Sequence, residues 1–342
     1  MRAWVYNGNK DIRLEELPEP IPGPGEVSVR IAYNGICGTD LHEYFHGPHF
    51  VPMDSAHPVT GHRGPVTMGH EASGTIQAVG EGIDDLDVGQ RVVLEPVVRQ
   101  PNDESRYNLG GAFYGIMAPG FLADSAVVPR SAIHVLPDNV GLAEGALTEP
   151  LAVAWHAAAK TGLEAGSSSV VFGGGPIGIG SILSLRARGV TRVAAVEPSP
   201  TRRSLLESLG AQTFDPTAAD YRDTLAEFVG DGVDACIDAA GVGGAVHDGL
   251  RVLGPEGRLV VVAVHAAPVS FDMNDLLLSE KSIVTSMGYR NDFPHVLEHL
   301  AAGKLPTDTW VEKVAFEDLI ERGIDRLATG DAVKILVEVS GG

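Results

Sequence analysis

The stretch Ser169-Val170-Val171-Phe172-Gly173-Gly174-Gly175-Pro176-Ile177-Gly178 joins a short apolar run to a glycine-rich turn and the start of a helical pattern. Its glycines satisfy G-x-G-x-x-G: the first permits a tight turn, the second lets the backbone approach a pyrophosphate, and the third lets the helix pack closely on the strand. Free N–H groups at the start of the helix then face the phosphates. The stretch predicts a dinucleotide site that includes Gly173, Gly175, Pro176, Ile177 and Gly178.

An acidic residue follows this motif at the spacing that dinucleotide recognition requires. Glu197 comes directly after the next apolar strand, Arg192–Val196, and lies 19 residues beyond Gly178. A carboxylate at this point accepts hydrogen bonds from the adenosine ribose hydroxyls and repels a 2′-phosphate, which favours NAD over NADP. Arg202 and Arg203 are close enough to complicate that choice, unless they are simply solvated on the following helix.

The pattern of predicted secondary structure differs between the two parts of the chain. From about residue 148, strand signals (169–172, 192–196, 234–239, 258–264 and 282–287) alternate with helix signals (151–159, 176–188, 200–209 and a helix beginning near Phe293). This alternation is typical of a parallel sheet covered by helices on both faces. The first third reads as short strands at 27–32, 74–79, 91–94 and 125–128, separated by Gly- and Pro-rich turns, which favours a small β-rich domain. A final strand at 333–339 is expected to return to that domain, so the fold class is α/β with a discontinuous first domain.

Composition excludes several classes of function. The 342 residues suffice for two domains, and 25 basic against 45 acidic side chains give a net charge of -20. Such a charge disfavours nucleic acids and anionic membranes as partners. There is no apolar run near the ~18 residues of a membrane span, and the first residues lack the layout of a secretory signal. Two cysteines exclude a disulfide scaffold and indicate a reducing, cytoplasmic location.

Possible metal ligands are scattered through the first half of the sequence. Cys37, His70 and Glu71 lie in the first domain and Glu149 lies at the junction with the second. Thiolate, imidazole and carboxylate suit zinc, and catalytic zinc uses three protein ligands with one open position. The alternative, in which Cys37 and His70 are ordinary buried residues, stays open at this stage. Cys236 lies in an apolar strand and is interpreted as core packing.

Three further histidines are spaced by four and three residues, at positions 42, 46 and 49. A continuous helix would align them, but Gly47 and Pro48 interrupt it. A second metal site is therefore not expected there.

The chain resembles the zinc-dependent medium-chain dehydrogenases over nearly its full length. The resemblance rests on the segments 35–44 (GICGTDLHEY), 65–71 (PVTMGHE), 148–156 (TEPLAVAWH) and 197–199 (EPS), together with the glycine motif. The insertion that begins at Gly47-Pro48 and the segment 289–293 (YRNDF) look most like the branch that contains (R,R)-butanediol and polyol dehydrogenases.

This resemblance implies a GroES-like catalytic domain (1–152 and 289–342) and a Rossmann NAD-binding domain (153–288), with the active site in the cleft between them and a homodimer or homotetramer as the assembly. It implies that Cys37, His70 and Glu149 hold one catalytic zinc, with Glu71 as an exchanging or neighbouring carboxylate. Thr39 would begin a proton relay that continues through the cofactor ribose toward His42, and Asp40 would orient a zinc ligand.

One departure from the family is plain. Relatives usually carry four closely spaced cysteines that bind a structural zinc, and the corresponding stretch 97–115 contains none. No structural zinc is expected here.

The resulting hypothesis is a zinc- and NAD-dependent oxidoreductase that acts on a secondary alcohol or ketone, in particular a vicinal diol such as 2,3-butanediol or its partner acetoin. Zinc would act as a Lewis acid and the alcohol carbon would give hydride to the nicotinamide. Two alternatives stay open: a sugar-alcohol (sorbitol-like) or threonine dehydrogenase with the same machinery, and a non-catalytic NAD-binding protein.

Overall fold

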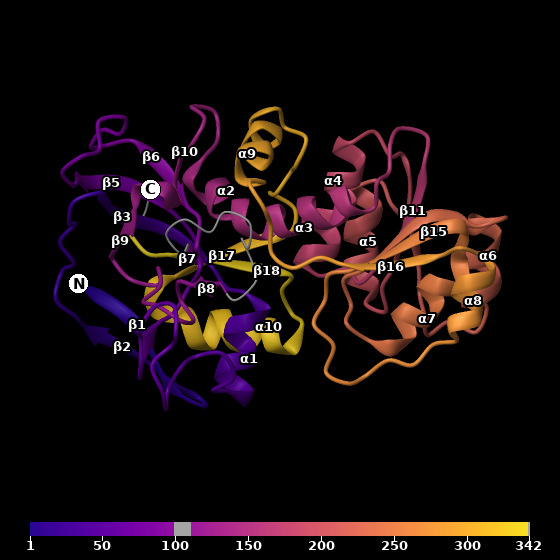
Figure 1. Ribbon diagram of the computed structural model, residues 1–342, viewed down its shortest axis with the longest axis horizontal. Coiled ribbons are helices and arrows are strands. Elements are labelled where there is room, and N and C mark those ends of the chain that lie inside the picture. The colour runs from indigo at the N-terminus through magenta and orange to yellow at the C-terminus, as the bar shows by residue number, and fades with distance from the viewer. Residues whose placement is uncertain (99–110, 341–342) are drawn as a thin grey trace. The chain divides into compact units, whose positions relative to one another are not determined.

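The computed structural model describes residues 1–98 and 111–340, and the chain divides into two units (Figure 1). Unit 1 comprises Met1–Glu149, Phe293–Ala301 and Val311–Gly342, and unit 2 comprises Pro150–Asp292 and Ala302–Trp310. The domain boundaries expected from the sequence, at 152/153 and 288/289, stay a prediction. Most of the stretch 97–115, where no structural zinc is expected, lies outside the described residues.

Unit 1 is built mainly from strands. They are β1 (Arg2–Gly8), β2 (Asp11–Glu16), β3 (Glu26–Gly35), β4 (Val66–Thr67), β5 (Glu71–Val79), β6 (Arg91–Leu94), β7 (Val97–Val98), β8 (Ala112–Phe113), β9 (Ser125–Pro129), β10 (Ile133–Val135), β17 (Val311–Ala315) and β18 (Lys334–Glu338). Its α-helices are α1 (Gly38–His46), α2 (Leu142–Ala146), α9 (Phe293–Ala301) and α10 (Asp325–Thr329), and α3 (Thr148–Lys160) begins in it.

The long strand β3 is the centre of unit 1. It pairs antiparallel with β5 along one edge, and with β9 and then β18 along the other. Its residues are buried along most of its length because apolar side chains cover both of its faces. Residues from β1, β3, β5, β6 and β18 form one continuous hydrophobic core. The strand β18 comes from the end of the chain, so the C-terminal segment completes the sheet that begins near the N-terminus.

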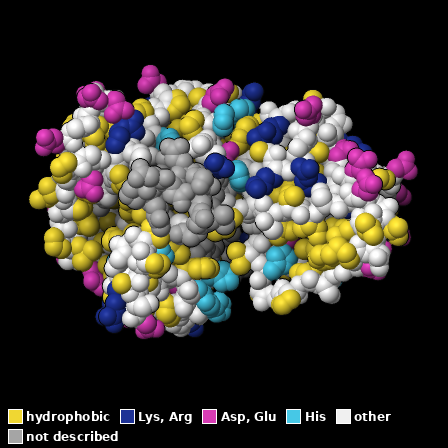
Figure 2. Space-filling view, in the orientation of Figure 1, with side chains coloured by type: hydrophobic (Ala, Val, Ile, Leu, Met, Phe, Trp, Pro, Cys, Tyr) yellow, Lys and Arg dark blue, Asp and Glu magenta, His cyan; other side chains and the backbone are white. Residues whose placement is uncertain are grey.

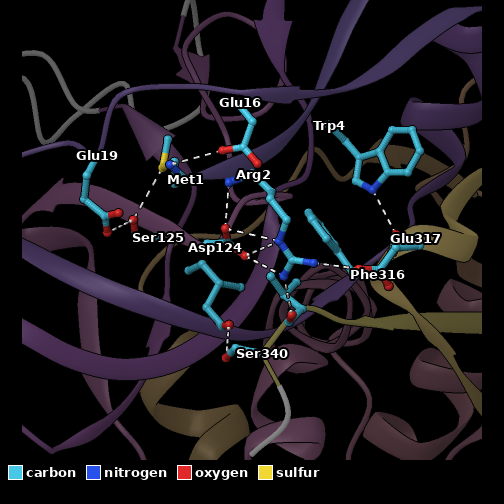
Figure 3. Close-up of polar contacts among 12 residues, drawn as sticks. Met1, Arg2, Trp4, Glu16, Glu19, Asp124, Ser125, Phe316, Glu317 and Ser340 are labelled. Carbon is cyan, nitrogen blue, oxygen red and sulfur yellow. Dashed lines mark hydrogen bonds and ion pairs between the residues drawn. The ribbon is translucent and has the colours of Figure 1, made fainter.

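A polar cluster ties the N-terminal strand to this returning segment (Figure 3). The Arg2 guanidinium donates to Asp124 at 2.8 Å and to Glu317 at 2.6 Å, and the Arg2 backbone N–H donates to Asp124 at 2.6 Å. The indole N–H of Trp4 donates to the carbonyl of Phe316 at 2.9 Å. The contacts to Phe316 and Glu317 join segments more than 300 positions apart in sequence, whereas Asp124 lies 122 positions from Arg2.

Unit 2 alternates strands and helices. In order these are β11 (Ser168–Phe172), α4 (Pro176–Ala187), β12 (Arg192–Val196), α5 (Pro200–Ser208), β13 (Gln212–Phe214), α6 (Tyr221–Val229), β14 (Val233–Asp238), α7 (Gly243–Val252), β15 (Leu253–Val261), α8 (Met273–Leu278) and β16 (Ser282–Thr285). The six strands are all parallel, in the order β13-β12-β11-β14-β15-β16. The order reverses between β11 and β14, as in a Rossmann sheet.

Helices cover both faces of this sheet. Val170, Phe172 and Cys236 form a buried cluster with Val246 of α7 on one face. The alternate residue Val171 is fully buried and points to the opposite face, because successive strand residues point to opposite sides. The predicted α/β class with a doubly wound second domain is confirmed, and Cys236 is a core residue whose pKa is raised by burial.

The long segment between α1 and β5 has little regular structure apart from the short strand β4. Glu43 of α1 holds its beginning, since the buried carboxylate accepts the backbone N–H groups of His49 and Phe50. Among the described residues, no helix has both the length and the apolar character that a membrane crossing requires.

The Arg2–Asp124 contact yields a stability prediction. Partial burial raises the pKa of Asp124, but the Arg2 hydrogen bonds lower it more, so the net direction is downward. Asp124→Asn is expected to lower the free energy of unfolding by about 1 kcal/mol at neutral pH. This is the usual net contribution of a hydrogen-bonded ion pair that is partly exposed to solvent. Because the pKa of Asp124 is lower in the folded protein, the difference from the wild-type protein begins to shrink as the pH falls below about 4 and is lost once the pH is below the lowered pKa.

Urea unfolding at neutral and acidic pH measures this effect. Asp84→Asn changes an exposed aspartate of the same unit and serves as the control. A loss that is the same for both variants, or one that persists at acidic pH, contradicts the assignment.

Candidate metal and dinucleotide sites

The metal-ligating residues of unit 1 meet at one end of β3. In the pairing register, Gly35 of β3 lies opposite Glu71 of β5 on one side and Leu336 of β18 on the other. A Cβ atom at Gly35 would overlap the carboxylate of Glu71, so only glycine leaves room for that side chain. The backbone N–H of Ile36 donates to Ile335 at 3.0 Å, which fixes the chain just before Cys37.

Cys37 is held by the start of helix α1. It is the N-cap residue, and its backbone N–H donates to Asp40 Oδ2 at 2.8 Å. Asp40 is buried, and its other oxygen lies 3.7 Å from His70 Nδ1. One carboxylate therefore caps the helix that carries Cys37 and faces the imidazole, which agrees with the orienting role that the family resemblance implies.

Cys37, His70 and Glu71 form a group able to bind a metal ion. One ligand atom from each lies within 4.8 Å of the others, and His70 and Glu71 are buried. His70 Nδ1 and Glu71 Oε1 are buried without a hydrogen bond to the described residues, while Glu71 Oε2 is engaged by a lysine. Soft thiolate with imidazole and carboxylate is a donor set that suits zinc. The residues present therefore fit the metal that the sequence predicted.

The electrostatics of this group also favour a cation. Burial lowers the pKa of His70, but the charges of Asp40, Cys37 and Glu149 raise it, and the net direction is strongly upward. Burial raises the pKa of Asp40 because a charged carboxylate loses its hydration. Several acidic groups are thus packed together in a buried position. A bound divalent cation would neutralise part of this charge.

The sequence reasoning missed Lys334, which contacts the same group. Its side chain is buried in β18, forms an ion pair with Glu71 Oε2 and donates to the Ile36 carbonyl at 2.8 Å. Burial lowers the pKa of Lys334, but Glu71 and Cys37 raise it more, so it is held in its charged form. The signal was present in the sequence, since a lysine inside an apolar strand needs a buried partner.

The other predicted site residues of unit 1 lie around this group. Thr39 is on the first turn of α1, with its Oγ1 atom 3.8 Å from Cys37 Sγ. Glu149 is buried in the first turn of α3 and its charge reaches His70 and Lys334, although it is not one of the three closest ligand residues. His42 lies one turn beyond Thr39 on α1 and is exposed.

Of the three histidines at positions 42, 46 and 49, the first two lie on helix α1 and the third does not. His42 and His46 are on α1 with ring centroids 6.1 Å apart, and His49 follows the end of the helix. Helix α1 ends at His46, before Gly47 and Pro48, as those two residues predicted.

The glycine motif of unit 2 forms the turn between β11 and α4. Gly173 has a φ of +102°, and a Cβ atom there would approach the Ala239 carbonyl to 2.9 Å. A Cβ atom at Gly178 would overlap the backbone of Gly173, so the helix starts in close contact with the strand. At Gly175, by contrast, a Cβ atom would meet no atom within 4 Å. Gly175 is the N-cap of α4, with Pro176 next, so the open space lies at a helix N-terminus that suits phosphate groups.

Glu197 lies next to this turn, at the carboxyl end of β12. Its carboxylate accepts the Gly174 N–H at 2.6 Å and the Ser199 N–H at 2.9 Å, and it is buried. Arg203 donates to the Glu197 carbonyl at 2.8 Å and pairs with Asp215 at 3.1 Å. Arg203 is therefore engaged by groups of its own unit, which disfavours a contact between Arg203 and the 2′-phosphate of NADP.

Comparison with known proteins agrees with this geometry. Residues 23–138 match the alcohol dehydrogenase GroES-like domain, and residues 176–302 match the zinc-binding dehydrogenase domain. The chain is 39% identical to (R,R)-butanediol dehydrogenase of Bacillus subtilis, over 98% of this chain and 99% of the relative. It is 36% identical to a Saccharomyces cerevisiae protein named probable diacetyl reductase 2, (R)-acetoin forming, over 95% and 85%.

The chain belongs to the zinc-binding alcohol dehydrogenase family. The crystal structure of 2R,3R-butanediol dehydrogenase from Bacillus subtilis covers 99% of both chains with a TM-score of 0.94 and 37% identity. The family resemblance and the pairing of a GroES-like domain with a Rossmann domain are confirmed, and this zinc-binding dehydrogenase is an enzyme of the oxidoreductase class.

We expect the purified dehydrogenase to hold about one zinc ion per chain. Cys37→Ser and His70→Asn are expected to reduce the zinc content by at least about tenfold, because each removes a metal ligand. Even the loss of a residue that only hydrogen-bonds to a ligand lowers metal affinity by about 10- to 100-fold. Cys236→Ser changes the only other cysteine and should keep the zinc. Metal analysis of the dialysed proteins measures this, and zinc that stays with Cys37→Ser contradicts the site.

Proposed function

We propose that this dehydrogenase catalyses the reversible, NAD-dependent oxidation of a secondary alcohol, with a vicinal diol such as 2,3-butanediol and its hydroxyketone acetoin as the substrate pair. The observation that carries the proposal is the group formed by Cys37, His70 and Glu71, whose ligand atoms lie within 4.8 Å of one another in a member of this family. The diol specificity is supported by similarity to proteins named for butanediol and diacetyl.

The metal would be held by Cys37, His70 and Glu71, with Glu149 as the adjacent carboxylate that replaces or joins Glu71. Zinc bound there would supply Lewis-acid catalysis, which lowers the pKa of an alcohol and stabilises negative charge on a carbonyl oxygen. Lys334 holds Glu71 by an ion pair, and Asp40 holds the backbone of Cys37. These residues keep the donor atoms in place before substrate binds.

The proton of the alcohol would leave through Thr39. Its hydroxyl borders the metal group and can accept one proton while donating another, although a hydroxyl alone titrates too high to act as a base. His42 is one turn further along α1 and exposed, so it can exchange the proton with water. We assign Thr39 and His42 as the proton relay.

The cofactor would be held by unit 2. Gly173, Gly175 and Gly178 provide the turn, and the open space at the N-terminus of α4, beside Pro176 and Ile177, would take the pyrophosphate. Glu197 would face the adenosine ribose, and its negative charge disfavours a 2′-phosphate. NAD is therefore the proposed cofactor, and when bound it would supply the hydride acceptor for the oxidation of the alcohol.

We predict that the zinc-loaded protein reduces NAD with 2,3-butanediol and oxidises NADH with acetoin, with lower catalytic efficiency for NADP. Thr39→Val is expected to lower kcat by about 100-fold because it removes the first proton carrier, while Thr39→Ser keeps the hydroxyl and restores most of the rate. Steady-state kinetics from NADH absorbance, with sorbitol and threonine as competing substrates, measures both effects.

Cofactor binding without turnover of any of these alcohols contradicts an enzymatic role. A preference for sorbitol or threonine rejects the diol but keeps the chemistry. Equal rates for Thr39→Val and the wild-type protein reject the relay.

A compartment that keeps thiols reduced fits the site, so we place the protein in the cytoplasm. Cys37 and Cys236 are both free, and a proposed zinc ligand must remain a thiol rather than a disulfide. Fractionation of the source cells that finds the protein in an oxidising compartment contradicts this.

We also propose that the chain forms a homodimer, alone or within a homotetramer, through the β16 edge of unit 2. Strand β16 ends the sheet and leaves a row of backbone groups without a strand partner in the described chain. Helix α8 directly precedes it and exposes Leu277 at 70% and Leu278 at 84%. Figure 2 shows hydrophobic side chains gathered over this part of unit 2. A second copy would cover both the edge and the patch.

The double substitution Leu277→Glu and Leu278→Glu is expected to halve the mass in solution, because buried charges at an interface cannot be hydrated. Light scattering after size-exclusion chromatography measures this. Val88→Glu, at a 65% exposed valine of unit 1, is the control and should not change the mass. A wild-type protein that is already monomeric contradicts the proposal.

A further inference from the structure

An aspartate–histidine pair lies beside the glycine turn and has no part in the site described so far. Asp238 is the last residue of β14 and is fully buried. His265 lies in the segment that follows β15, with its Nε2 atom 2.7 Å from Asp238 Oδ2 and its side chain 18% exposed. The other oxygen of Asp238 accepts the N–H groups of Ala240 and Gly241, both at 3.0 Å. One oxygen of the buried carboxylate therefore accepts two backbone hydrogen bonds, and the other oxygen holds the imidazole of His265.

The pair lies at the point where a dinucleotide crosses the sheet. In open α/β sheets the ligand binds outside the carboxyl ends of the strands, where the strand order reverses, and here that is between β11 and β14. Gly173 follows β11 and packs against Ala239, the residue directly after Asp238. The backbone N–H of Ala239 also donates to the Phe172 carbonyl at 2.9 Å. The glycine turn and the aspartate–histidine pair are therefore parts of one surface.

The order of the strands decides which half of the cofactor reaches His265. Glu197 follows β12, the glycine turn follows β11, Asp238 ends β14, and His265 follows β15, so these groups succeed one another along the carboxyl edge. With the adenosine ribose at Glu197 and the pyrophosphate at the glycine turn, the remaining nucleoside extends toward β14 and β15. Strand β15, which leads to His265, lies two positions from β11 in the sheet, about 10 Å at the usual spacing of about 4.8 Å between neighbouring strands.

The chemistry of the pair suits a hydrogen bond with that nucleoside. An ionised carboxylate only accepts, so the Asp238 contact places a proton on Nε2 of His265 and leaves Nδ1 of the neutral ring as an acceptor. Within residues 1–98 and 111–340, Nδ1 of His265 makes no hydrogen bond. A ribose hydroxyl or a carboxamide NH₂ would satisfy it.

We infer that His265 is a cofactor-contact residue that binds the nicotinamide nucleoside of NAD through Nδ1, and that Asp238 is the positioning residue that sets its tautomer and orientation. This inference rests on the proposed NAD site and adds to it the residue that recognises the second half of the cofactor. The predicted signature is a loss of affinity that depends on the part of the ligand that is present.

The experiment compares three ligands on the zinc-loaded protein: NADH, ADP-ribose and ADP, with binding measured by calorimetry and, for NADH, by its fluorescence. His265→Phe keeps a ring of similar size but removes both nitrogens. It is expected to raise the Kd of NADH by roughly three- to tenfold, the effect of one lost hydrogen bond. The Kd of ADP, which lacks the second nucleoside, should not change. His265→Gln offers an amide oxygen at a similar reach and should recover part of the NADH affinity.

The matched control is His247→Phe, which changes an exposed histidine of α7 and should leave all three affinities unchanged. If ADP-ribose weakens with NADH, the contact is to the ribose hydroxyls; if only NADH weakens, it is to the carboxamide. Both results support the inference. Equal weakening of all three ligands indicates a structural role, and no weakening removes His265 from the site. Either outcome overturns the inference.

A second measurement needs no substitution. Acylation of histidines by diethyl pyrocarbonate, read peptide by peptide in the wild-type protein, should show that NADH protects His265 whereas ADP does not. Protection by neither ligand, or by both, contradicts the inference. If the wild-type protein binds no NADH at all, the proposed function fails first, so the two failures are distinguishable.

Discussion

The buried ion pair between Glu71 and Lys334 holds the metal group of unit 1 together. Glu71 lies beside Cys37, Asp40 and His70 in a buried position, and closely packed acidic groups repel one another strongly there. Lys334 supplies the compensating charge and also donates to the Ile36 carbonyl, one residue before Cys37. Removing either charge would leave the other buried and unpaired, which is far more costly than losing a surface pair. The ligands can therefore be preorganised before metal is bound.

That ion pair depends on the topology of unit 1. Strand β3 has β5 on one edge and β18 on the other, so residues 71 and 334 approach it from opposite sides although they are far apart in sequence. The ion pair between Arg2 and Glu317 and the hydrogen bond between Trp4 and Phe316 hold the C-terminal segment of unit 1 just after β17. The stability of the C-terminal segment and the geometry of the metal group are consequently linked, because both require β18 to pair with β3.

Unit 2 places its functional groups by a different rule. All of its strands are parallel, so their carboxyl ends share one edge, and the residues directly after each strand meet there as a consequence of the strand order. Gly173, Glu197 and Asp238 reach this edge from three neighbouring strands, and close backbone contacts at the glycine turn fix their spacing. A site of this kind is largely encoded by local sequence, strand by strand.

The sequence by itself therefore determined the Rossmann unit well. The strands around Val170 and Val193, the helix after Gly175 and the role of Gly173 follow from short-range periodicity and glycine chemistry, and the structure has them at the predicted positions to within one or two residues. It also supplied the metal-ligand types, although only the family resemblance grouped them.

Only the tertiary structure brought Lys334 to Glu71 and His265 to Asp238. Each contact joins two different strands or loops, and local sequence patterns do not predict which of these lie next to each other in space. The spacing of residues along the chain predicts which side chains are neighbours within a single helix or strand. The burial of a charge beside its partner is decided by which strands pair.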